Sequence, residues 1–223
     1  MMQQLVLELA PPAAPSLENF FPGPNEAAVA ALRDALAGGE RVVYLFGEPG
    51  SGKTHLLRAA VREAEALGRT ARYAGAPHNG PTMRAECDVL AVDDIEQLDS
   101  AAQLALFDAF NDLSAGKGRL FGAGTPPAAE LPLREDLRTR LGSGLSLRLA
   151  PLNDEEKAAA LTWHAAQRGL ELAPEILGYL LTHCRRDMGT QMAVLDALDR
   201  HSLVHKRPVT LPLLREALRA LEQ

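Results

Sequence analysis

Residues 47–54 read G-E-P-G-S-G-K-T, the complete pattern of a phosphate-binding loop. An apolar run, 42–46, precedes the loop, and a helical pattern, 55–67, follows it. In this context backbone N–H groups surround a polyphosphate, the Lys53 ammonium reaches its outer phosphates, and the Thr54 hydroxyl ligates Mg²⁺. A glycine turn that only joins a strand to a helix would not explain Lys53 and Thr54, and we expect Lys53 to be exposed, without a packing role. The predicted cofactor-binding residues are Gly47, Glu48, Pro49, Gly50, Ser51, Gly52, Lys53, Thr54 and His55.

Two adjacent carboxylates, Asp93 and Asp94, follow a second apolar run, 89–92. A buried strand would deliver both acids to its carboxyl end. In an enzyme with a phosphate-binding loop, Asp93 would hold Mg²⁺ through water, and Asp94 would orient or deprotonate the attacking water. Acids are also common at solvated strand ends, but the phosphate-binding loop upstream favours the functional interpretation.

Composition excludes several classes of protein. The chain has 223 residues, 47% of them hydrophobic, and a net charge of −6. No apolar stretch is long enough to span a bilayer, and no basic and apolar leader begins the chain, so we expect a cytoplasmic protein without a membrane partner. Lys and Arg are scattered, so direct binding to duplex DNA is not expected. Cys87 and Cys184 lack metal-ligand spacing and are expected to be free thiols.

The order of apolar runs and amphipathic stretches predicts an α/β fold with a five-stranded parallel sheet, followed by a small all-helical subdomain. Asn25 is expected to cap the first helix. After Pro151 the pattern is helical only. The predicted strands are 41–46, 70–74, 88–94, 119–123 and 145–149, and the predicted helices of the second part are 154–168, 174–184, 187–205 and 212–221. We expect a peptide and linker in residues 1–15, the α/β subdomain in 16–150 and the helical lid in 151–223.

This order resembles the AAA+ ATPases, and several strings resemble the DnaA/Hda family among them. The strings are G-x-x-G-S-G-K-T-H-L-L, V-D-D-I-E-Q-L, and the segment 16–20 with Gly23 and Asn25, which is similar to the segment that wraps the base. The resemblance implies ADP or ATP with Mg²⁺ as the cofactor. Residues 138–141 resemble the arginine-finger segment of the family, which implies that Arg140 is a catalytic finger directed at a neighbour's nucleotide. Asp94 is the other predicted catalytic residue.

The N-terminal residues 4–9, Q-L-V-L-E-L, resemble a sliding-clamp-binding motif. A glutamine for a polar subsite and leucines at alternate positions suit an extended peptide in a hydrophobic groove. The predicted clamp-binding residues are Gln4, Leu5, Leu7 and Leu9, tethered by the Ala/Pro-rich stretch 10–15; the alternative is a first strand of the fold. The chain also ends where DnaA would continue into its helix-turn-helix domain, so the resemblance is to the Hda branch, whose members inactivate DnaA.

The resemblance implies two protein partners, DnaA and the sliding clamp (the beta subunit of DNA polymerase III), with DNA reached only through the clamp and homo-oligomers possible. Two positions depart from the family pattern. After the fourth strand, only Thr125 can supply a polar side chain. In the lid, Gly189 stands where the family carries an arginine, and Arg186, one helical turn earlier, would compensate only in part. Little or no ATP hydrolysis by the chain itself is therefore expected.

The expected function is regulation of replication initiation: bound to a DNA-loaded clamp, the protein would stimulate hydrolysis of DnaA-bound ATP. Two alternatives stay open, namely an autonomous AAA+ ATPase of the helicase-loader type and a non-catalytic adaptor that carries a nucleotide.

Overall fold

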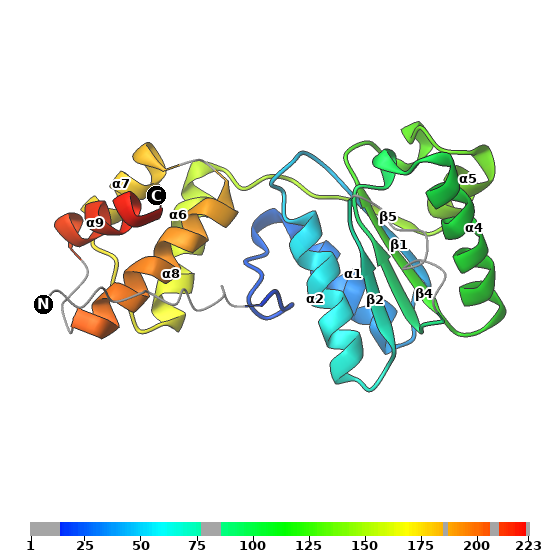
Figure 1. Ribbon diagram of the computed structural model, residues 1–223, viewed down its shortest axis with the longest axis horizontal. Helices are drawn as coiled ribbons and strands as arrows, with labels where there is room; N and C mark the ends of the chain where they lie inside the picture. The colour runs from blue at the N-terminus through cyan, green and yellow to red at the C-terminus, as the bar shows by residue number, and fades with distance from the viewer. Residues whose placement is uncertain (1–13, 77–85, 185–186, 206–209, 222–223) are drawn as a thin grey trace, which may run out of the picture. The chain divides into compact units, whose positions relative to one another are not determined.

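The computed structural model describes residues 14–76, 86–184, 187–205 and 210–221 (Figure 1). The described chain forms two compact units, residues 15–160 and the residues from 161 onward, and the division falls inside helix α6 (Asp154–Gln167). The clamp-binding residues Gln4, Leu5, Leu7 and Leu9 lie outside the described residues. The domain boundaries expected after residues 15 and 150 stay predictions.

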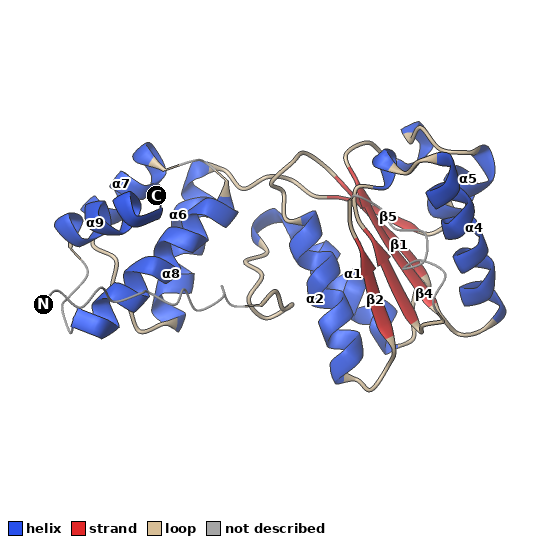
Figure 2. Ribbon diagram, in the orientation of Figure 1, coloured by secondary structure: helices blue, strands red, loops and turns tan. Residues whose placement is uncertain are grey.

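A parallel sheet forms the centre of the larger unit (Figure 2). Its order is β2-β3-β4-β1-β5, and every neighbouring pair is parallel. The predicted five-stranded parallel sheet is thus confirmed, with β1 (Val42–Phe46), β2 (Ala71–Ala74), β3 (Val89–Val92), β4 (Arg119–Gly124) and β5 (Leu145–Arg148). Because the strands are parallel, the phosphate-binding loop after β1, the acids after β3 and the loop after β4 leave the sheet at the same edge.

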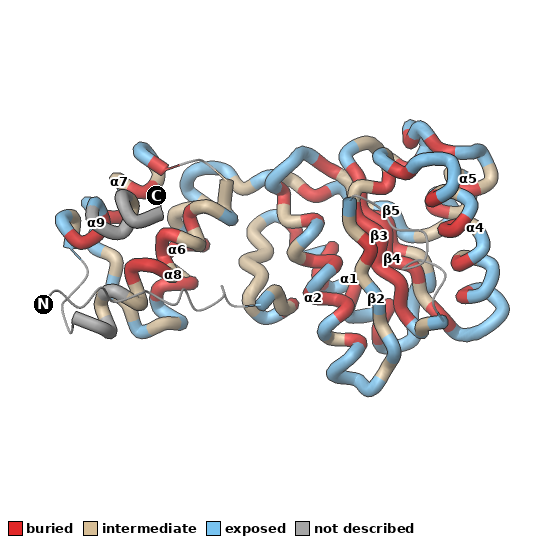
Figure 3. The backbone as a smooth tube through the Cα atoms, in the orientation of Figure 1, coloured by how far each residue is buried: buried red, intermediate tan, exposed pale blue. Residues whose placement is uncertain are grey.

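Helices cover both faces of the sheet, which is why its inner strands are buried (Figure 3). Alternation along β1 sends Val43 and Leu45 to one core and Tyr44 to the other. β3 is apolar and buried along its whole length, as expected for a central parallel strand. The first core includes residues of α1 (Glu26–Ala37) and α2 (Lys53–Ala66), and the second includes residues of α4 (Ser100–Ala115) and α5 (Glu135–Gly142).

The start of α1 differs from its prediction. Asn25 occupies the N-cap position, but its side chain makes no cap hydrogen bond. Its amide nitrogen instead donates to the Ala150 carbonyl at 2.9 Å, and its amide oxygen accepts from the Ala150 N–H at 2.8 Å. Asn25 is 4% exposed, and the nearby Ala150 backbone satisfies both groups of its amide. The residue therefore joins the backbone just after β5 to the start of α1 rather than capping the helix. Short 3₁₀ turns η1 (Gly23–Asn25), η2 (Ile95–Gln97) and η3 (Ala128–Glu130) complete the unit.

The second unit is helical, as predicted. It contains the end of α6 together with α7 (Pro174–His183), α8 (Met188–His205) and α9 (Leu211–Leu221). Leu161, Leu180 and Leu198 are fully buried in its core. An ion pair, Arg168 to Asp196 at 2.5 Å, lies in the same unit with both side chains mostly buried. Both cysteines of the chain are free thiols. Within the described residues, no helix is long and apolar enough to cross a membrane.

Candidate nucleotide-binding site

The loop 47–54 has a backbone that requires glycine at two positions. Gly47 has φ 151°, and a Cβ there would lie 2.3 Å from the Leu149 carbonyl oxygen. Gly52 has φ 99°, and a Cβ there would lie 2.7 Å from the Phe20 ring. Both positions are thus closed to side chains by conformation and by contact. α2 begins directly after Gly52, so its N-terminal N–H groups stand at the loop, where a phosphate is favoured.

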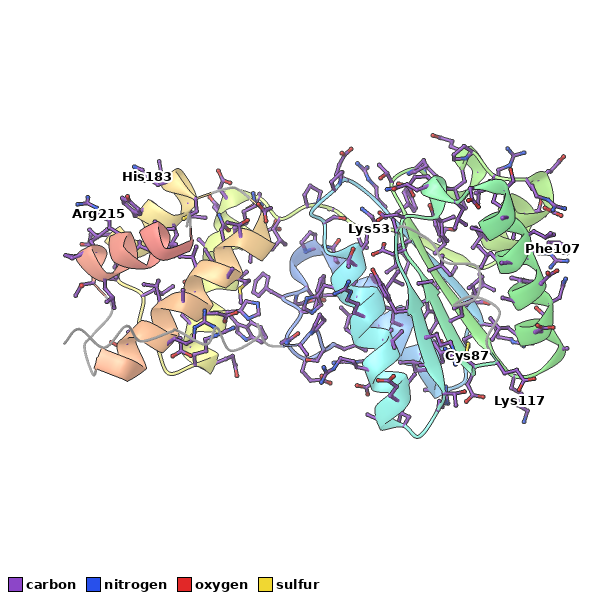
Figure 4. All side chains as sticks on the ribbon, in the orientation of Figure 1. Lys53, Cys87, Phe107, Lys117, His183 and Arg215 are labelled. Carbon is purple, nitrogen blue, oxygen red and sulfur yellow. The ribbon has the colours of Figure 1, made fainter. Side chains whose placement is uncertain are left out.

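Lys53 is buried, which corrects the expectation of an exposed side chain. It is 7% exposed, and its ammonium donates to the carbonyl oxygens of Gly47 at 2.7 Å and Glu48 at 3.0 Å. The loop curls around the ammonium, because a buried cation needs acceptors and the loop carbonyls are within its reach. Figure 4 shows Lys53 at the end of the sheet opposite to Cys87 and Lys117. The charge predicted to meet phosphates therefore lies inside the loop.

The predicted metal-binding residues lie together. The Thr54 hydroxyl donates to Asp93 Oδ2 at 2.6 Å, and Asp93 is 2% exposed. The Tyr73 hydroxyl donates to the same carboxylate oxygen at 2.9 Å, and burial, with the charge of Asp93, raises the pKa of Tyr73 to about 12. These hard oxygen atoms suit Mg²⁺, which proteins usually hold with one or two carboxylates, water and substrate phosphates. Among the described residues, no group of three or more His, Cys, Asp or Glu could hold a metal ion. Sequence reasoning missed Tyr73.

Asp94, the predicted catalytic acid, has an unusual backbone. Its φ is 47° and its ψ 46°, the left-handed region, which Asp tolerates better than most residues. Its N–H donates to Asp93 Oδ1 at 3.1 Å. Unusual backbone conformations are common at functional sites, and this one lies between the end of β3 and residues 95–97. Its catalytic role stays a prediction.

His55 joins α2 to the segment 16–20. Its Nε2 lies 3.2 Å from the Ser16 carbonyl oxygen, and its ring centroid lies 5.4 Å from that of Phe20. Burial lowers the pKa of His55, and the hydrogen bond with Ser16 opposes that effect in part. The imidazole is therefore neutral near pH 7. The segment is ordered from within, because Ser16 and Asn19 exchange side-chain to backbone hydrogen bonds of 2.8 and 3.1 Å. A cofactor-binding role for His55 stays a prediction.

Arg140, the predicted finger, lies in the last turn of α5 and contacts α4. Its Nη1 donates to Asn111 Oδ1 at 2.5 Å. Its guanidinium carbon lies 4.1 Å from the ring centroid of Phe107 and 4.8 Å from that of Phe110, within the range of cation–π attraction. Figure 4 shows Phe107 on the side of α4 away from the sheet. We call Phe107, Phe110 and Asn111 the α4 ledge. No hydrogen bond or ion pair in the described part of the chain joins Arg140 to residues 47–54.

Comparisons with known proteins agree with this architecture. Residues 154–218 match the family model "Hda, lid domain". AMPPCP-bound DnaA from Aquifex aeolicus is similar in structure, with a TM-score of 0.72, 22% identity, and coverage of 89% of this chain and 70% of that one. Domain III of Thermotoga maritima DnaA has a TM-score of 0.75, 20% identity, and coverage of 95% and 98%. A point mutant of RuvB from Thermotoga maritima has a TM-score of 0.65, 22% identity, and coverage of 93% and 72%. These likenesses in structure show the AAA+ fold, and the Hda lid match concerns residues 154–218 alone.

The chain has the AAA+ fold, and its residues 154–218 match the lid of the Hda family. This family is expected to carry a polar sensor residue at the end of β4. There, Glu96 Oε1 accepts a hydrogen bond from the Thr125 N–H at 2.9 Å, while the Thr125 side chain is exposed. Its Oε2 is buried without a hydrogen-bond partner among the described residues. Sequence reasoning missed Glu96, because nothing in V-D-D-I-E-Q-L distinguishes it from a solvated residue.

The lid position expected to carry an arginine in the Hda/DnaA family is open here. Among the described residues, and apart from the backbone of its own helix, a Cβ built on Gly189 would meet one atom within 4 Å, Asp187 Oδ1 at 3.4 Å. None of the described residues of the helical unit therefore requires glycine at this position. Arg186, expected to compensate in part, lies outside the described residues.

Proposed function

We propose that this chain is a nucleotide-binding regulator that stimulates hydrolysis of ATP bound to DnaA. The family relationship supports a DnaA-related replication regulator, and the Hda lid match is the observation that carries the proposal. The A. aeolicus DnaA of similar fold was solved with AMPPCP, which supports ADP or ATP as the cofactor. This proposal assigns the chain the role of an activator, not of the protein whose ATP is cleaved.

The chain's own nucleotide would be held by the loop 47–54. Lys53 would transfer its ammonium from the loop carbonyls to phosphate oxygens, and the N–H groups at the start of α2 would face the same phosphates. Thr54 and Asp93 would hold Mg²⁺, Thr54 directly and Asp93 through water. The cation would supply neutralisation of phosphate charge when bound.

Arg140 would act on the neighbouring subunit. An arginine supplied in trans neutralises charge that develops on a transferring phosphoryl group, and its planar fork fits phosphate oxygens. The α4 ledge supports this role, because it holds the guanidinium in one orientation while the residue stays partly exposed. Residues 4–9 would anchor the protein on the DNA-loaded sliding clamp, which would bring DnaA and Arg140 together at high effective concentration.

A second candidate, an autonomous AAA+ ATPase, is favoured by one observation. Thr54 and Asp93, which would hold the Mg²⁺ of a hydrolysing site, already lie together. Against it stands the lid position 189, where glycine offers no cation to the γ-phosphate. ATP turnover by the purified chain, without clamp or DnaA, would support this candidate.

The test measures conversion of DnaA-bound ATP to ADP in the presence of clamp loaded on DNA. Arg140→Ala should lower the stimulated rate by about 10³-fold or more, as removal of a trans arginine does in other phosphoryl-transfer systems. Arg140→Lys should also fail, because one ammonium cannot reproduce a bidentate fork. Arg138→Ala is the matched control, since Arg138 lies two residues earlier in α5 and should stimulate normally.

Each outcome separates the candidates. Loss in Arg138→Ala with normal stimulation by Arg140→Ala would show that the finger is the other arginine. Normal stimulation by both variants would exclude an arginine supplied from α5. Clamp binding and nucleotide binding should be unchanged in Arg140→Ala, so a loss of either would point to a structural defect.

A further inference from the structure

We propose that Tyr73 is a positioning residue for the metal site, one that fixes the Asp93 carboxylate for a divalent cation. The inference rests on the nucleotide site proposed above. Tyr73 lies on β2, next to the strand that carries Asp93, and it does not belong to any motif in the sequence.

The Asp93 carboxylate is held at both oxygens. Oδ2 accepts from the Thr54 hydroxyl at 2.6 Å and from the Tyr73 hydroxyl at 2.9 Å, and Oδ1 accepts from the Asp94 N–H at 3.1 Å. A carboxylate with donors on both oxygens cannot rotate without breaking a hydrogen bond. Mg²⁺ demands near-ideal octahedral geometry, so a fixed carboxylate is of direct use to it.

The pairing of β2 with β3 places the tyrosine. Tyr73 is level with Ala91, and Ala74 is level with Val92. The Ala74 carbonyl also accepts the Asp93 N–H at 2.9 Å, so the backbone hydrogen bonding continues past the strand. From the level of Ala91, the long phenol side chain extends along β3 to the carboxylate. A shorter side chain at position 73 could not span that interval.

The Tyr73 ring is itself held in place. It packs against the core shared with α1 and α2, and the Arg58 guanidinium of α2 lies 4.8 Å from its centroid. The packing and the cation–π contact together restrict the orientation of the ring and so the direction of its hydroxyl. Partners of this kind, which hold metal ligands without touching the metal, typically contribute about 10–100-fold to metal affinity.

The experiment compares ADP affinity in saturating Mg²⁺ with ADP affinity in EDTA, by calorimetry on the full chain. In the wild type, Mg²⁺ should strengthen ADP binding. Tyr73→Phe keeps the ring and removes the hydroxyl, so it should lower the ratio of the two affinities by about 10-fold or more. Its ADP affinity in EDTA should equal that of the wild type, which a merely structural defect would not allow.

Tyr44→Phe is the matched control. Tyr44 is a buried phenol on β1, and its hydroxyl donates to the Pro126 carbonyl at 2.8 Å. Its variant should leave the Mg²⁺ dependence unchanged. A wild-type ratio in Tyr73→Phe, or an equal fall in both variants, overturns the inference while the nucleotide site stands. Failure of the wild type to bind ADP at all overturns the site itself, and the inference with it.

Discussion

Lys53→Met tests whether the buried ammonium both organises the loop and binds phosphate. Methionine keeps an unbranched stem of similar length and removes the charge. The Lys53 ammonium has two carbonyl partners, at 2.7 and 3.0 Å. Hydrogen bonds to charged groups contribute about 1.5–3 kcal/mol each. Gly47 is buried, so its carbonyl would lose its partner, whereas Glu48 is exposed and its carbonyl could be hydrated. Without nucleotide, the free energy of unfolding should therefore fall by about 1–3 kcal/mol.

The same contacts limit the expected loss of affinity. In the wild type, the ammonium must exchange its carbonyl partners for phosphate oxygens, whereas the methionine variant has no such bonds to break. The loss of affinity is thus the difference between two sets of charged hydrogen bonds, about 1.5–3 kcal/mol for one uncompensated contact. That corresponds to an increase of about 10- to 150-fold in the dissociation constant for ADP. Fluorescence titration with a labelled ADP measures the affinity, and urea unfolding without nucleotide measures the stability.

Ser51→Ala serves as the control within the loop. The Ser51 hydroxyl is buried, with no hydrogen-bond partner among the described residues, so its removal should not lower the free energy of unfolding. Unchanged ADP affinity in a folded Lys53→Met protein would refute the phosphate role. Unchanged stability without nucleotide would refute the argument that the ammonium organises the loop carbonyls.

Two further predictions concern the N-terminus and pH. Gln4→Ala combined with Leu5→Ala should abolish capture of the sliding clamp in a pull-down without changing the melting temperature, and a large fall in melting temperature would instead indicate a strand of the fold. Burial lowers the pKa of His55, so below about pH 6.5 the unfolded chain binds a proton that the folded chain does not, and the free energy of unfolding falls as pH decreases. His55→Gln should remove this part of the pH dependence, as measured by urea unfolding at about pH 7.5 and about pH 5.5; equal slopes in the two proteins would contradict the assignment.

The strands and helices could be predicted because their signals are local. The loop 47–54 fixes where β1 ends and α2 begins, since its glycines and Lys53 suit one strand, loop and helix arrangement. The four apolar residues of β3 likewise indicate burial on both faces. The predicted exposure of the Lys53 side chain was wrong. The motif indicates that the ammonium binds phosphate, but it does not indicate that the carbonyl groups of the loop accept hydrogen bonds from the ammonium and bury it.

Contacts between distant segments could not be predicted in the same way. The hydrogen bond from Tyr73 to Asp93 depends on the register of β2 against β3, which no local pattern specifies. Asn25 has a sequence typical of a helix cap, yet the nearby Ala150 backbone offers its amide two hydrogen bonds at once. In both cases the hydrogen-bond partner lies far away in the sequence, so the local sequence does not indicate which contact the side chain makes.

The end of β4 explains in physical terms why a polar sensor side chain is missing there. A Cβ on Gly124 would lie 2.5 Å from the Tyr44 hydroxyl oxygen and 2.7 Å from Glu96 Oε2. Tyr44 is fully buried, so it cannot move aside, and burial together with the charge of Glu96 raises its pKa. No side chain fits at 124 while Tyr44 and Glu96 keep these places. Thr125 is exposed, and the described structure fixes only its backbone N–H. Absence of a side chain at this position, and of a cation at 189, weakens the case for hydrolysis by this chain, whereas the assembled Thr54 and Asp93 remain suited to holding a nucleotide. That combination supports the proposal that the protein carries its own nucleotide and acts on that of a neighbour.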